Sequence, residues 1–298
     1  MNKQLIVILG IIVCLVAYCF VVEPNLLKVT KYKVEDSNLA GVKIVFLADL
    51  HLKPHDFGKL KKVVKLVKEQ KPDAVIIGGD FAFKTGDKKK SMDMNIAAQI
   101  LKTIYPEYST KKNIPIFAVC GNYDNLMDAD VIENGKKVHK HGWEIIEKAF
   151  SDNQITLIKD NSRARIKDPA TNKMGDVYIK NRRVDIIGIA DIKTKQPDTG
   201  MALRGSKKPR IVVTHNPDIY YDILDDVSLI LAGHTHGGQF ILPFTQPLYV
   251  PSKFGAEFAS GLIQKGKNKM IVTTGVGTSR IPVRFNCRPE IVVVEFTN

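Results

Sequence analysis

We predict a layered α/β domain preceded by one membrane-spanning helix, and three observations support this prediction. The 298 residues are 44% apolar and 25% charged, an ordinary globular composition that excludes a disordered or collagen-like chain. Residues 5–22 contain no charged side chain, and a run of this length just suffices to cross a bilayer as a helix. Beyond them, short β-branched runs alternate with helical patterns and are followed by further strands.

The first element is the apolar N-terminal segment. We interpret it as a retained single-pass anchor, because residues 17–20 (AYCF) lack the small-x-small site of a cleaved signal peptide, which stays the alternative. Lys28, Lys31 and Lys33 follow the segment, against Lys3 before it, so the positive-inside rule places the body on the cytoplasmic side of the inner membrane. We expect an anchor over 1–22, a basic linker over 23–40 and one domain over 41–298.

The charge balance narrows the possible partners. Lys and Arg total 44 against 31 Asp and Glu, a net charge of +13, and only Lys3 precedes the apolar run, which leaves +12 for the rest. Such an excess suits an anionic partner such as nucleic acid, lipid head groups or a phosphorylated substrate, or else a solvated lysine-rich surface. Lysines also crowd residues 84–90. The four cysteines show no zinc or disulfide spacing, and Cys120 is expected to be a buried thiol.

The body begins with a predicted strand over 43–48 (KIVFLA). Apolar residues at Leu60, Val63, Val64 and Val67 have helical spacing, which predicts a helix over 57–69. Further strands are predicted at 73–77, 114–120, 155–158, 184–189, 210–214, 228–232, 270–274 and 291–296, with a second helix at about 92–104 and a polar hairpin-like stretch between 158 and 184.

Five of these apolar strands lead, directly or through one or two glycines, to aspartate, asparagine or histidine. In open α/β sheets the carboxyl ends of the strands line the ligand crevice, so these side chains should converge. The seven residues are Asp49, His51, Asp80, Asn122, His215, His234 and His236. Members of the pairs Asp49/His51 and His234/His236 are two residues apart, so each pair projects to one side of an extended chain.

Two carboxylates, one amide oxygen and four imidazoles suit borderline divalent ions such as manganese, iron, cobalt, nickel or zinc. Seven ligands are too many for one ion with open positions, but they suit two ions about 3.5–4 Å apart, the arrangement used for phosphoester displacement. Each motif alone is typical of an ordinary turn. The order of the motifs and their common position at strand ends support the prediction of a two-metal site. The other histidines, His55, His139 and His141, lie in polar stretches and are expected on the surface.

The ordered motifs D-L-H, G-G-D, G-N-Y-D, T-H-N-P and G-H-T-H-G-G-Q resemble the calcineurin-like metallophosphoesterase superfamily from about residue 41 to the end of the chain. Residues 275–290 resemble its bacterial branch with an N-terminal membrane helix. The resemblance implies a four-layer α/β/β/α sandwich with two metal ions at the strand ends. It assigns one ion to Asp49, His51, Asp80 and His236, and the other to Asp80 as the bridge with Asn122, His215 and His234. The implied reaction is attack on phosphorus by a metal-bridging hydroxide, with manganese expected first and iron, zinc, cobalt, nickel or magnesium as alternatives.

One position departs from the family pattern, because most members carry histidine where this chain has Tyr123. A phenol, with a pKa near 10, donates a hydrogen bond to phosphate but is a poor proton shuttle at neutral pH. The departure favours a substrate with a good leaving group, such as a phosphoanhydride. The expected catalytic set is Asp80, Asn122, Tyr123 and Asp124, the last orienting its neighbours. The alternative is that Tyr123 packs and Arg284 contacts the phosphate.

The loop over 240–258 is rich in aromatic residues and proline and directly follows the histidine motif. Through Phe244 and Tyr249 it could accept acyl chains, or it could simply cap the sandwich. The first hypothesis is therefore a membrane hydrolase of a lipid-linked phosphoester or pyrophosphate, similar to family members that act on UDP-2,3-diacylglucosamine in lipid A biosynthesis and release UMP. We expect an anionic membrane surface and this phosphorylated substrate as partners.

Two other classes of function remain open. The second hypothesis is a phosphodiesterase or nuclease acting on a soluble nucleotide or nucleic acid, which the +12 body would suit. No accessory nucleic-acid module accompanies it, so a stable nucleic-acid partner is not expected. The third is a non-catalytic scaffold, which the presence of all seven expected ligands disfavours.

Overall fold

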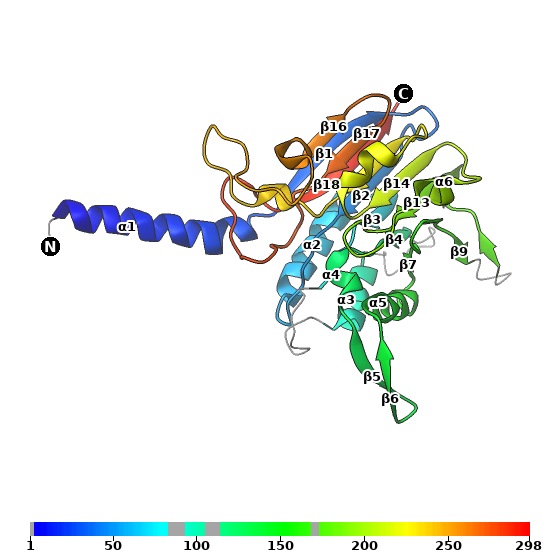
Figure 1. Ribbon diagram of the computed structural model, residues 1–298, viewed down its shortest axis with the longest axis horizontal. Coiled ribbons are helices and arrows are strands. Elements are labelled where there is room, and N and C mark those ends of the chain that lie inside the picture. Colours follow the sequence, from blue (N-terminus) through cyan, green and yellow to red (C-terminus); the bar gives the residue numbers. More distant parts are fainter. Residues whose placement is uncertain (1–2, 83–92, 105–113, 168–172) are drawn as a thin grey trace.

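Two six-stranded sheets face each other in the computed structural model, which describes residues 3–82, 93–104, 114–167 and 173–298 (Figure 1). The lysine-rich run 84–90 lies outside the described residues. In spatial order the first sheet contains β1 (Lys28–Glu35), β18 (Glu290–Thr297), β2 (Lys43–Leu47), β3 (Ala74–Ile77), β4 (Ile116–Ala118) and β7 (Ile155–Leu157). The second contains β16 (Gly261–Gln264), β17 (Lys269–Val272), β15 (Leu229–Ala232), β14 (Arg210–Thr214), β13 (Asp185–Ile189) and β8 (Ser162–Arg163).

Helices cover the outer face of each sheet. The first sheet carries α2 (Phe57–Glu69), α3 (Met94–Lys102) and α5 (Gly142–Ser151), and the second carries α6 (Thr199–Leu203) with 3-10 turns at Pro217–Asp222 and Gly255–Phe258. The short helix α4 (Asn122–Asn125) follows β4, and Cys120 is buried beside it as a free thiol. The described residues also form three two-stranded ribbons: β5 (Ala129–Glu133) with β6 (Lys136–Lys140), β9 (Ile166–Lys167) with β10 (Met174–Gly175), and β11 (Tyr178–Ile179) with β12 (Arg182–Arg183).

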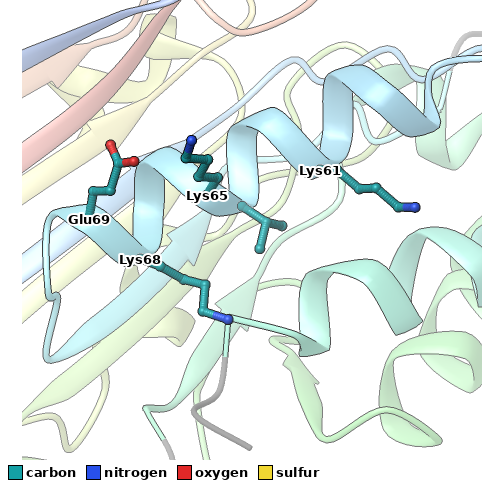
Figure 2. Close-up of a pocket in the computed structure, with 5 residues that line it drawn as sticks. Lys61, Lys65, Lys68 and Glu69 are labelled. Atoms are coloured by element: carbon teal, nitrogen blue, oxygen red, sulfur yellow. The ribbon is translucent and has the colours of Figure 1, made fainter.

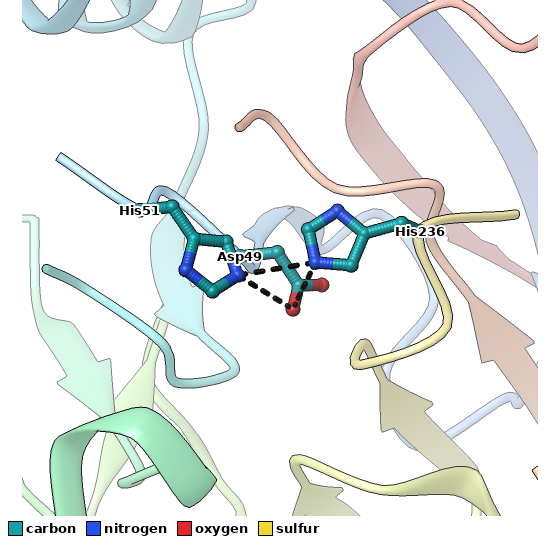
Figure 3. A group of neighbouring side chains, drawn as sticks. All are labelled: Asp49, His51 and His236. Atoms are coloured by element: carbon teal, nitrogen blue, oxygen red, sulfur yellow. Dashed lines mark hydrogen bonds and ion pairs between the residues drawn. The ribbon is translucent and has the colours of Figure 1, made fainter. Parts of the chain in front are cut away.

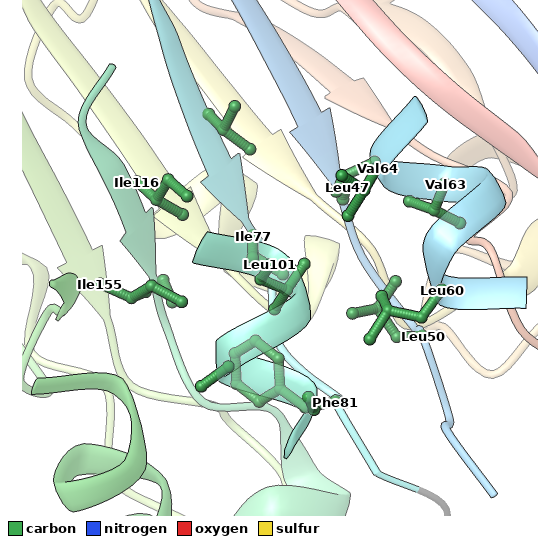
Figure 4. Packing of buried hydrophobic residues seen from close by; sticks show 14 of the residues in the cluster. Leu47, Leu50, Leu60, Val63, Val64, Ile77, Phe81, Leu101, Ile116 and Ile155 are labelled. Carbon is green, nitrogen blue, oxygen red and sulfur yellow. The ribbon is translucent and has the colours of Figure 1, made fainter. Parts of the chain in front are cut away.

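Three apolar clusters hold these layers together. The helical spacing of α2 places Leu60 and Val63 against Leu47 and Ile77 of the first sheet (Figure 4). Between the sheets, alternate residues of facing strands meet, among them Phe46 and Val213. Behind the second sheet, Val212 and Ile230 pack on Tyr220 and Phe258. The layers run helix, sheet, sheet, helix, which confirms the predicted four-layer sandwich.

The expected basic linker over 23–40 contains a strand instead. All eight residues of β1 pair in parallel with β18, from Lys28 opposite Glu290 to Glu35 opposite Thr297. Its sequence, KVTKYKVE, alternates polar and apolar residues only from Lys31 to Glu35, and Val34 is the one buried residue of the strand. Because its partner lies about 260 positions away along the chain, as the hydrogen bond from Thr30 to Glu290 shows, local pattern could not reveal the pairing. The domain therefore begins before residue 41.

The N-terminal segment is helical and extends away from the sandwich (Figure 1). Helix α1 (Lys3–Ala17) continues through a π-helical turn (Tyr18–Val22) and a 3-10 turn (Glu23–Asn25). Over Lys3–Asn25 it is long and apolar enough to cross a membrane, and no other helix among the described residues meets that test. Its inner end is fixed to the domain, because Cys19 and Glu23 are buried.

Candidate metal centre

The polar residues predicted at the strand ends converge at one edge of the two sheets. Strands β2, β3 and β4 deliver Asp49, His51, Asp80 and Asn122, and strands β14 and β15 deliver His215, His234 and His236. Because β2, β3 and β4 are parallel, and β14 and β15 are also parallel, their carboxyl ends lie together within each sheet. Six of the seven residues are buried, the most exposed being His234 at 8%.

The backbone is strained where it presents these side chains. Five of them have φ in the left-handed region that non-glycine residues rarely adopt: Asp49 (54°), His51 (42°), Asp80 (55°), His234 (72°) and His236 (52°). Each such residue costs about 1–3 kcal/mol, so it persists only where surrounding structure enforces it. Two glycines make room: a Cβ at Gly121 would meet an Asp80 oxygen at 2.3 Å, and one at Gly233 would meet an Asp49 oxygen at 2.6 Å. The loops are thus shaped to bring the side chains together.

One group of potential ligands comprises Asp49, His51 and His236 (Figure 3). The Nε2 atoms of the two histidines are 3.1 Å apart, and Oδ1 of Asp49 is 3.4 Å from Nε2 of His236 and 3.9 Å from that of His51. The backbone N–H of His234 donates to Asp49 Oδ2 at 2.9 Å and so fixes the carboxylate. Three donor atoms therefore surround one point.

A second group comprises Asp49, Asp80 and His215. Oδ2 of Asp80 is 3.3 Å from Nε2 of His215 and 3.5 Å from Nε2 of His51, so this carboxylate faces both groups. The Nδ1 atom of His234 is 3.2 Å from Nε2 of His215. Asn122 Oδ1 is buried and has no hydrogen-bond partner among the described residues. The position of Asp80 between the groups supports its predicted role as a bridge, and the full ligand assignment stays a prediction.

The lowered pKa values of three histidines suit cation binding, whereas the raised pKa of His215 reflects its pairing with Asp80. Burial lowers the pKa of His51 to about 4 and the pKa values of His234 and His236 well below their usual range, so these three imidazoles are uncharged at neutral pH. Burial would raise the pKa of Asp80, but the charge and hydrogen bond of His215 hold it at about 2. The same carboxylate raises the pKa of His215 well above its usual range against the opposing effect of burial.

The neighbours of the ligands fix their orientation. Nδ1 of His215 donates to the carbonyl of Gly78 at 2.8 Å, which turns its Nε2 toward the carboxylates. The buried carboxylate of Asp124 accepts N–H bonds from Asp80 (2.7 Å), Phe81 (2.9 Å) and Gly121 (2.8 Å), so it ties the loop after β3 to the loop after β4. Asp124 is thus a positioning residue. The buried, prearranged donors and the unpartnered Asn122 oxygen fit divalent ions.

A cavity of about 460 Å³ opens beside these ligands. It is lined by Asp80, Asn122, Tyr123, Lys193, His234, Thr235, His236, Gly238, Gln239, Phe240, Tyr249, Pro251, Ser279, Arg280, Ile281 and Val283. The ring of Tyr123 meets His51 edge-on with centroids 4.8 Å apart, and its hydroxyl lies 3.4 Å from Ser279 Oγ. Its backbone N–H donates to Asp80 Oδ1 at 2.8 Å. Tyr123 therefore lies at the boundary between the ligands and the cavity.

The structure changes the set of candidate substrate residues. Arg284 is fully buried, and its guanidinium donates to the carbonyls of Thr274 (2.8 Å), Gly277 (2.5 Å) and Cys287 (2.9 Å), so the expectation that it contacts phosphate is wrong. The two terminal nitrogens of the guanidinium instead hold converging backbone carbonyls. Phe244 is fully exposed and does not line the cavity, whereas Tyr249 does.

Lys193 and Arg280 are the cations that sequence reasoning missed at the cavity. A signal existed for Lys193, because it follows β13, a further parallel strand of the second sheet, at the edge where the other strand ends carry ligands. Of the histidines predicted to lie on the surface, His139 and His141 are exposed, at 61% and 58% of their side chains, and His55 is exposed too.

Comparison with known proteins agrees with this geometry. The calcineurin-like phosphoesterase family model matches residues 42–238. The chain is 27% identical to the uncharacterized metallophosphoesterase YkuE of Bacillus subtilis, over 93% of this chain and 87% of that protein. It is 27% identical to the phosphodiesterase YaeI of Escherichia coli, over 93% and 90%.

It is also 24% identical to the UDP-2,3-diacylglucosamine pyrophosphatase LpxG of Chlamydia muridarum, over 91% of this chain and 90% of that protein. These relatives are matched over most of their length, and the family model covers well over half of this chain. The two carboxylates and four imidazoles that meet at the strand ends are the ligands such an enzyme needs. The chain belongs to the calcineurin-like phosphoesterase family, and it is a hydrolase of phosphate esters.

Proposed function

We propose that the protein is a membrane-anchored hydrolase of a lipid-linked phosphodiester or pyrophosphate, with UDP-2,3-diacylglucosamine as the first candidate substrate. The observation that supports this most is the cavity, whose lining combines metal ligands with the exposed apolar side chains of Tyr249 and Ile281. A phosphate at the ligands and an acyl-bearing group against these side chains would use both parts of the lining. The matched pyrophosphatase of Chlamydia muridarum acts on a substrate of this kind by its name.

Different residues of the chain would bind the metal ions, contact the phosphates and position the loops. The two groups around Asp49 and Asp80 would hold two divalent ions, manganese first, and these would supply a water nucleophile at neutral pH and positive charge for the phosphate oxygens. Lys193 and Arg280 line the same cavity and add charge for a second phosphate. The Tyr123 hydroxyl can donate a hydrogen bond to the substrate, and Asp124 holds the loops in register.

Tyr123 bears on the leaving group. A phenol is a weak acid that does not readily give up its proton at neutral pH, so it assists a departing alkoxide poorly. A nucleoside phosphate leaves without such help. The residue therefore favours cleavage of a phosphoanhydride, as in a nucleotide-linked lipid, over hydrolysis of a simple alkyl phosphate.

The proposed setting is a single-pass anchor in the inner membrane with the domain on the cytoplasmic side, against an anionic lipid surface. The apolar N-terminal helix and the lysines that follow it support this arrangement. The second candidate is a phosphodiesterase acting on a soluble nucleotide, which the name of the matched phosphodiesterase of Escherichia coli and the net charge of +13 favour.

A substrate panel tests the proposal. The full-length protein in detergent, loaded with manganese, is given p-nitrophenyl phosphate, bis-p-nitrophenyl phosphate, UDP-N-acetylglucosamine and UDP-2,3-diacylglucosamine, and UMP is measured by chromatography. We expect UMP from the diacylated substrate at a rate well above that from UDP-N-acetylglucosamine. Turnover of the diester without UMP release would reject the lipid substrate and favour the soluble phosphodiesterase. Asp80→Asn serves as the inactive control, and magnesium, zinc and iron are compared with manganese.

A further inference from the structure

The inner end of the N-terminal helix is fixed directly to a loop beside the metal centre. The backbone N–H of Arg284 donates to the carbonyl of Cys19 at 2.9 Å. The Glu23 carboxylate accepts the N–H groups of Asn286 (3.0 Å) and Cys287 (2.6 Å) and is 1% exposed. A buried carboxylate with two N–H donors holds its position firmly. Three hydrogen bonds therefore tie the inner end of the helix to this loop.

The same loop continues into the segment that carries a metal ligand. Phe285 donates its N–H to Gln239 and accepts one from Ile241, both at 2.9 Å. The Phe240 and Phe285 rings lie 5.3 Å apart. Cys287 Sγ donates to the carbonyl of His236 at 3.3 Å. Two packed segments thus connect the helix end to His236, so the position of the helix sets the position of the cavity.

The length of the apolar run fixes where this junction lies in a bilayer. Its 18 residues extend about 27 Å at 1.5 Å per residue, slightly less than the hydrocarbon thickness of about 30 Å. If the helix spans the bilayer, all 18 apolar residues are needed to cross the hydrocarbon layer. The turn from Cys19 to Glu23, at the end of this run, must therefore lie at the hydrocarbon boundary. The loop over 284–287, which contacts this turn, and the segment from Gln239 to Ile241, which pairs with that loop, then lie near the boundary too.

These loops expose large apolar side chains, which we call the rim patch. It consists of Leu242 (39% exposed), Phe244 (107%), Leu248 (69%), Tyr249 (70%) and Ile281 (57%). Phe244 also has φ of 62°, a strained conformation for a bulky residue that leaves its ring entirely outside the protein. Tyr249 and Ile281 belong to the cavity wall as well, so the patch and the cavity mouth are continuous.

Basic side chains lie beside the junction. Lys62 of α2 donates to the carbonyl of Asn25 at 3.3 Å, which places this helix against the end of the anchor. Figure 2 shows Lys61, Lys65 and Lys68 along α2, where with Val64 and Glu69 they line a shallow surface pocket. Lysines at this level meet anionic head groups, while the adjacent apolar patch meets the acyl region.

We infer that the rim patch enters the surface layer of a phospholipid bilayer, so that the cavity opens at the membrane and takes its phosphoester directly from the lipid phase. This rests on the anchoring proposed above and specifies how the proposed substrate reaches the site. The phosphate of a membrane lipid would then lie near the metal ligands while its acyl chains stay in the bilayer. Extraction of the whole lipid into water would not be needed.

Depth-dependent fluorescence quenching tests the inference without relying on activity. Trp143, the single tryptophan, is replaced by Phe, and Phe244→Trp or Tyr178→Trp is added to the full chain in vesicles of phosphatidylcholine with one quarter phosphatidylglycerol. Tyr178 is 56% exposed on β11, and its hairpin contacts Asn38 beyond the far end of β1, so it is the matched control. With brominated phosphatidylcholine we expect Phe244→Trp to lose at least half its emission and Tyr178→Trp less than a tenth. Equal quenching of the two would overturn the inference.

A second measurement concerns substrate delivery. The double variant Leu242→Asp, Leu248→Asp changes two patch residues outside the cavity wall. We expect kcat/KM for UDP-2,3-diacylglucosamine in vesicles to fall at least tenfold, with turnover of soluble bis-p-nitrophenyl phosphate unchanged within twofold. An equal loss on both substrates, or no loss on either, would contradict the inference. If the wild type leaves the vesicle lipid intact, the proposed substrate fails, and the quenching result still decides whether the patch enters the bilayer.

Discussion

Two groups of one aspartate and two histidines occur in the part of the chain that the structure describes, and they differ in burial and in position in the fold although their donor atoms are the same. Asp49, His51 and His236 are at most 3% exposed, whereas the side chains of Asp128, His139 and His141 are 42–61% exposed. In both groups the ligand atoms lie within 4.8 Å of one another. The first group lies at buried strand ends, and the second lies on and beside the β5–β6 hairpin.

The contrast shows what turns a cluster of ligands into a metal site. Water solvates the exposed histidines, so they gain little from an ion, and binding would cost the side-chain freedom of all three residues. The buried donors have lost water already and are held by strained backbone and by hydrogen bonds such as that from His234 N–H to Asp49. For them an ion replaces missing solvation at little cost in entropy.

The largest expected effect is on catalysis. Asp80→Asn removes the charge that faces both His51 and His215, so we expect turnover of bis-p-nitrophenyl phosphate to fall by about 10³-fold, the equivalent of about 4 kcal/mol of barrier. Asp128→Asn, the matching change in the hairpin group, should stay within twofold of the wild type. Initial rates with manganese measure both, and comparable losses in the two variants would remove the distinction between the groups.

Metal removal should affect stability next. A ligand present at 100 to 1,000 times its Kd stabilises the folded state by about 3–4 kcal/mol, which corresponds to about 5–10 °C in Tm for a domain of this size. We expect chelation followed by desalting to lower Tm by that amount and manganese to restore it, as followed by scanning fluorimetry. Asp128→Asn should show the same shift. A Tm that does not respond to chelation would mean that the buried group holds no ion.

In the metal-free protein, lowering the pH should reduce the stability contributed by the buried His51. The pKa of His51 is lowered to about 4 by burial, below its ordinary value near 6.5, so the unfolded chain binds the extra proton between these values. Stability from a neutral His51 is therefore present above pH 6.5 and lost as the pH falls toward 4. The free energy of unfolding of the wild type relative to His51→Gln should drop over this window by up to about 3 kcal/mol.

Urea unfolding in detergent at several pH values measures this difference. His139→Gln, on the exposed hairpin, is measured in parallel as a control for the general effect of replacing a histidine by glutamine. A flat difference for His51→Gln would mean that the buried imidazole has an ordinary affinity for protons.

The residues that flank each histidine pair already indicated which of the two groups would be buried. H-T-H over 234–236 follows an apolar strand and lies between glycines, whereas H-K-H over 139–141 lies among lysines and charged residues. The position of the seven ligand candidates after predicted strands was enough to predict that they converge, because the carboxyl ends of parallel strands lie at the same edge of a sheet. What the sequence could not show depends on distant partners: β1 pairs with β18 at the other end of the chain, and Arg284 is buried by carbonyls of its own loop.

The smallest expected effect belongs to the hairpin group itself. Replacing His139 and His141 together by alanine removes exposed side chains whose contacts are to Asp128 and Asp130, so stability should change by no more than about 0.5 kcal/mol. The backbone N–H of His141 still donates its capping hydrogen bond to the Glu144 carboxylate, because a side-chain deletion leaves that donor in place. Activity should stay within twofold, and metal analysis should return the wild-type number of ions per chain. Loss of one ion in this variant would show that exposed donors at such spacing bind metal here without burial, and the contrast between the groups would then reflect affinity alone.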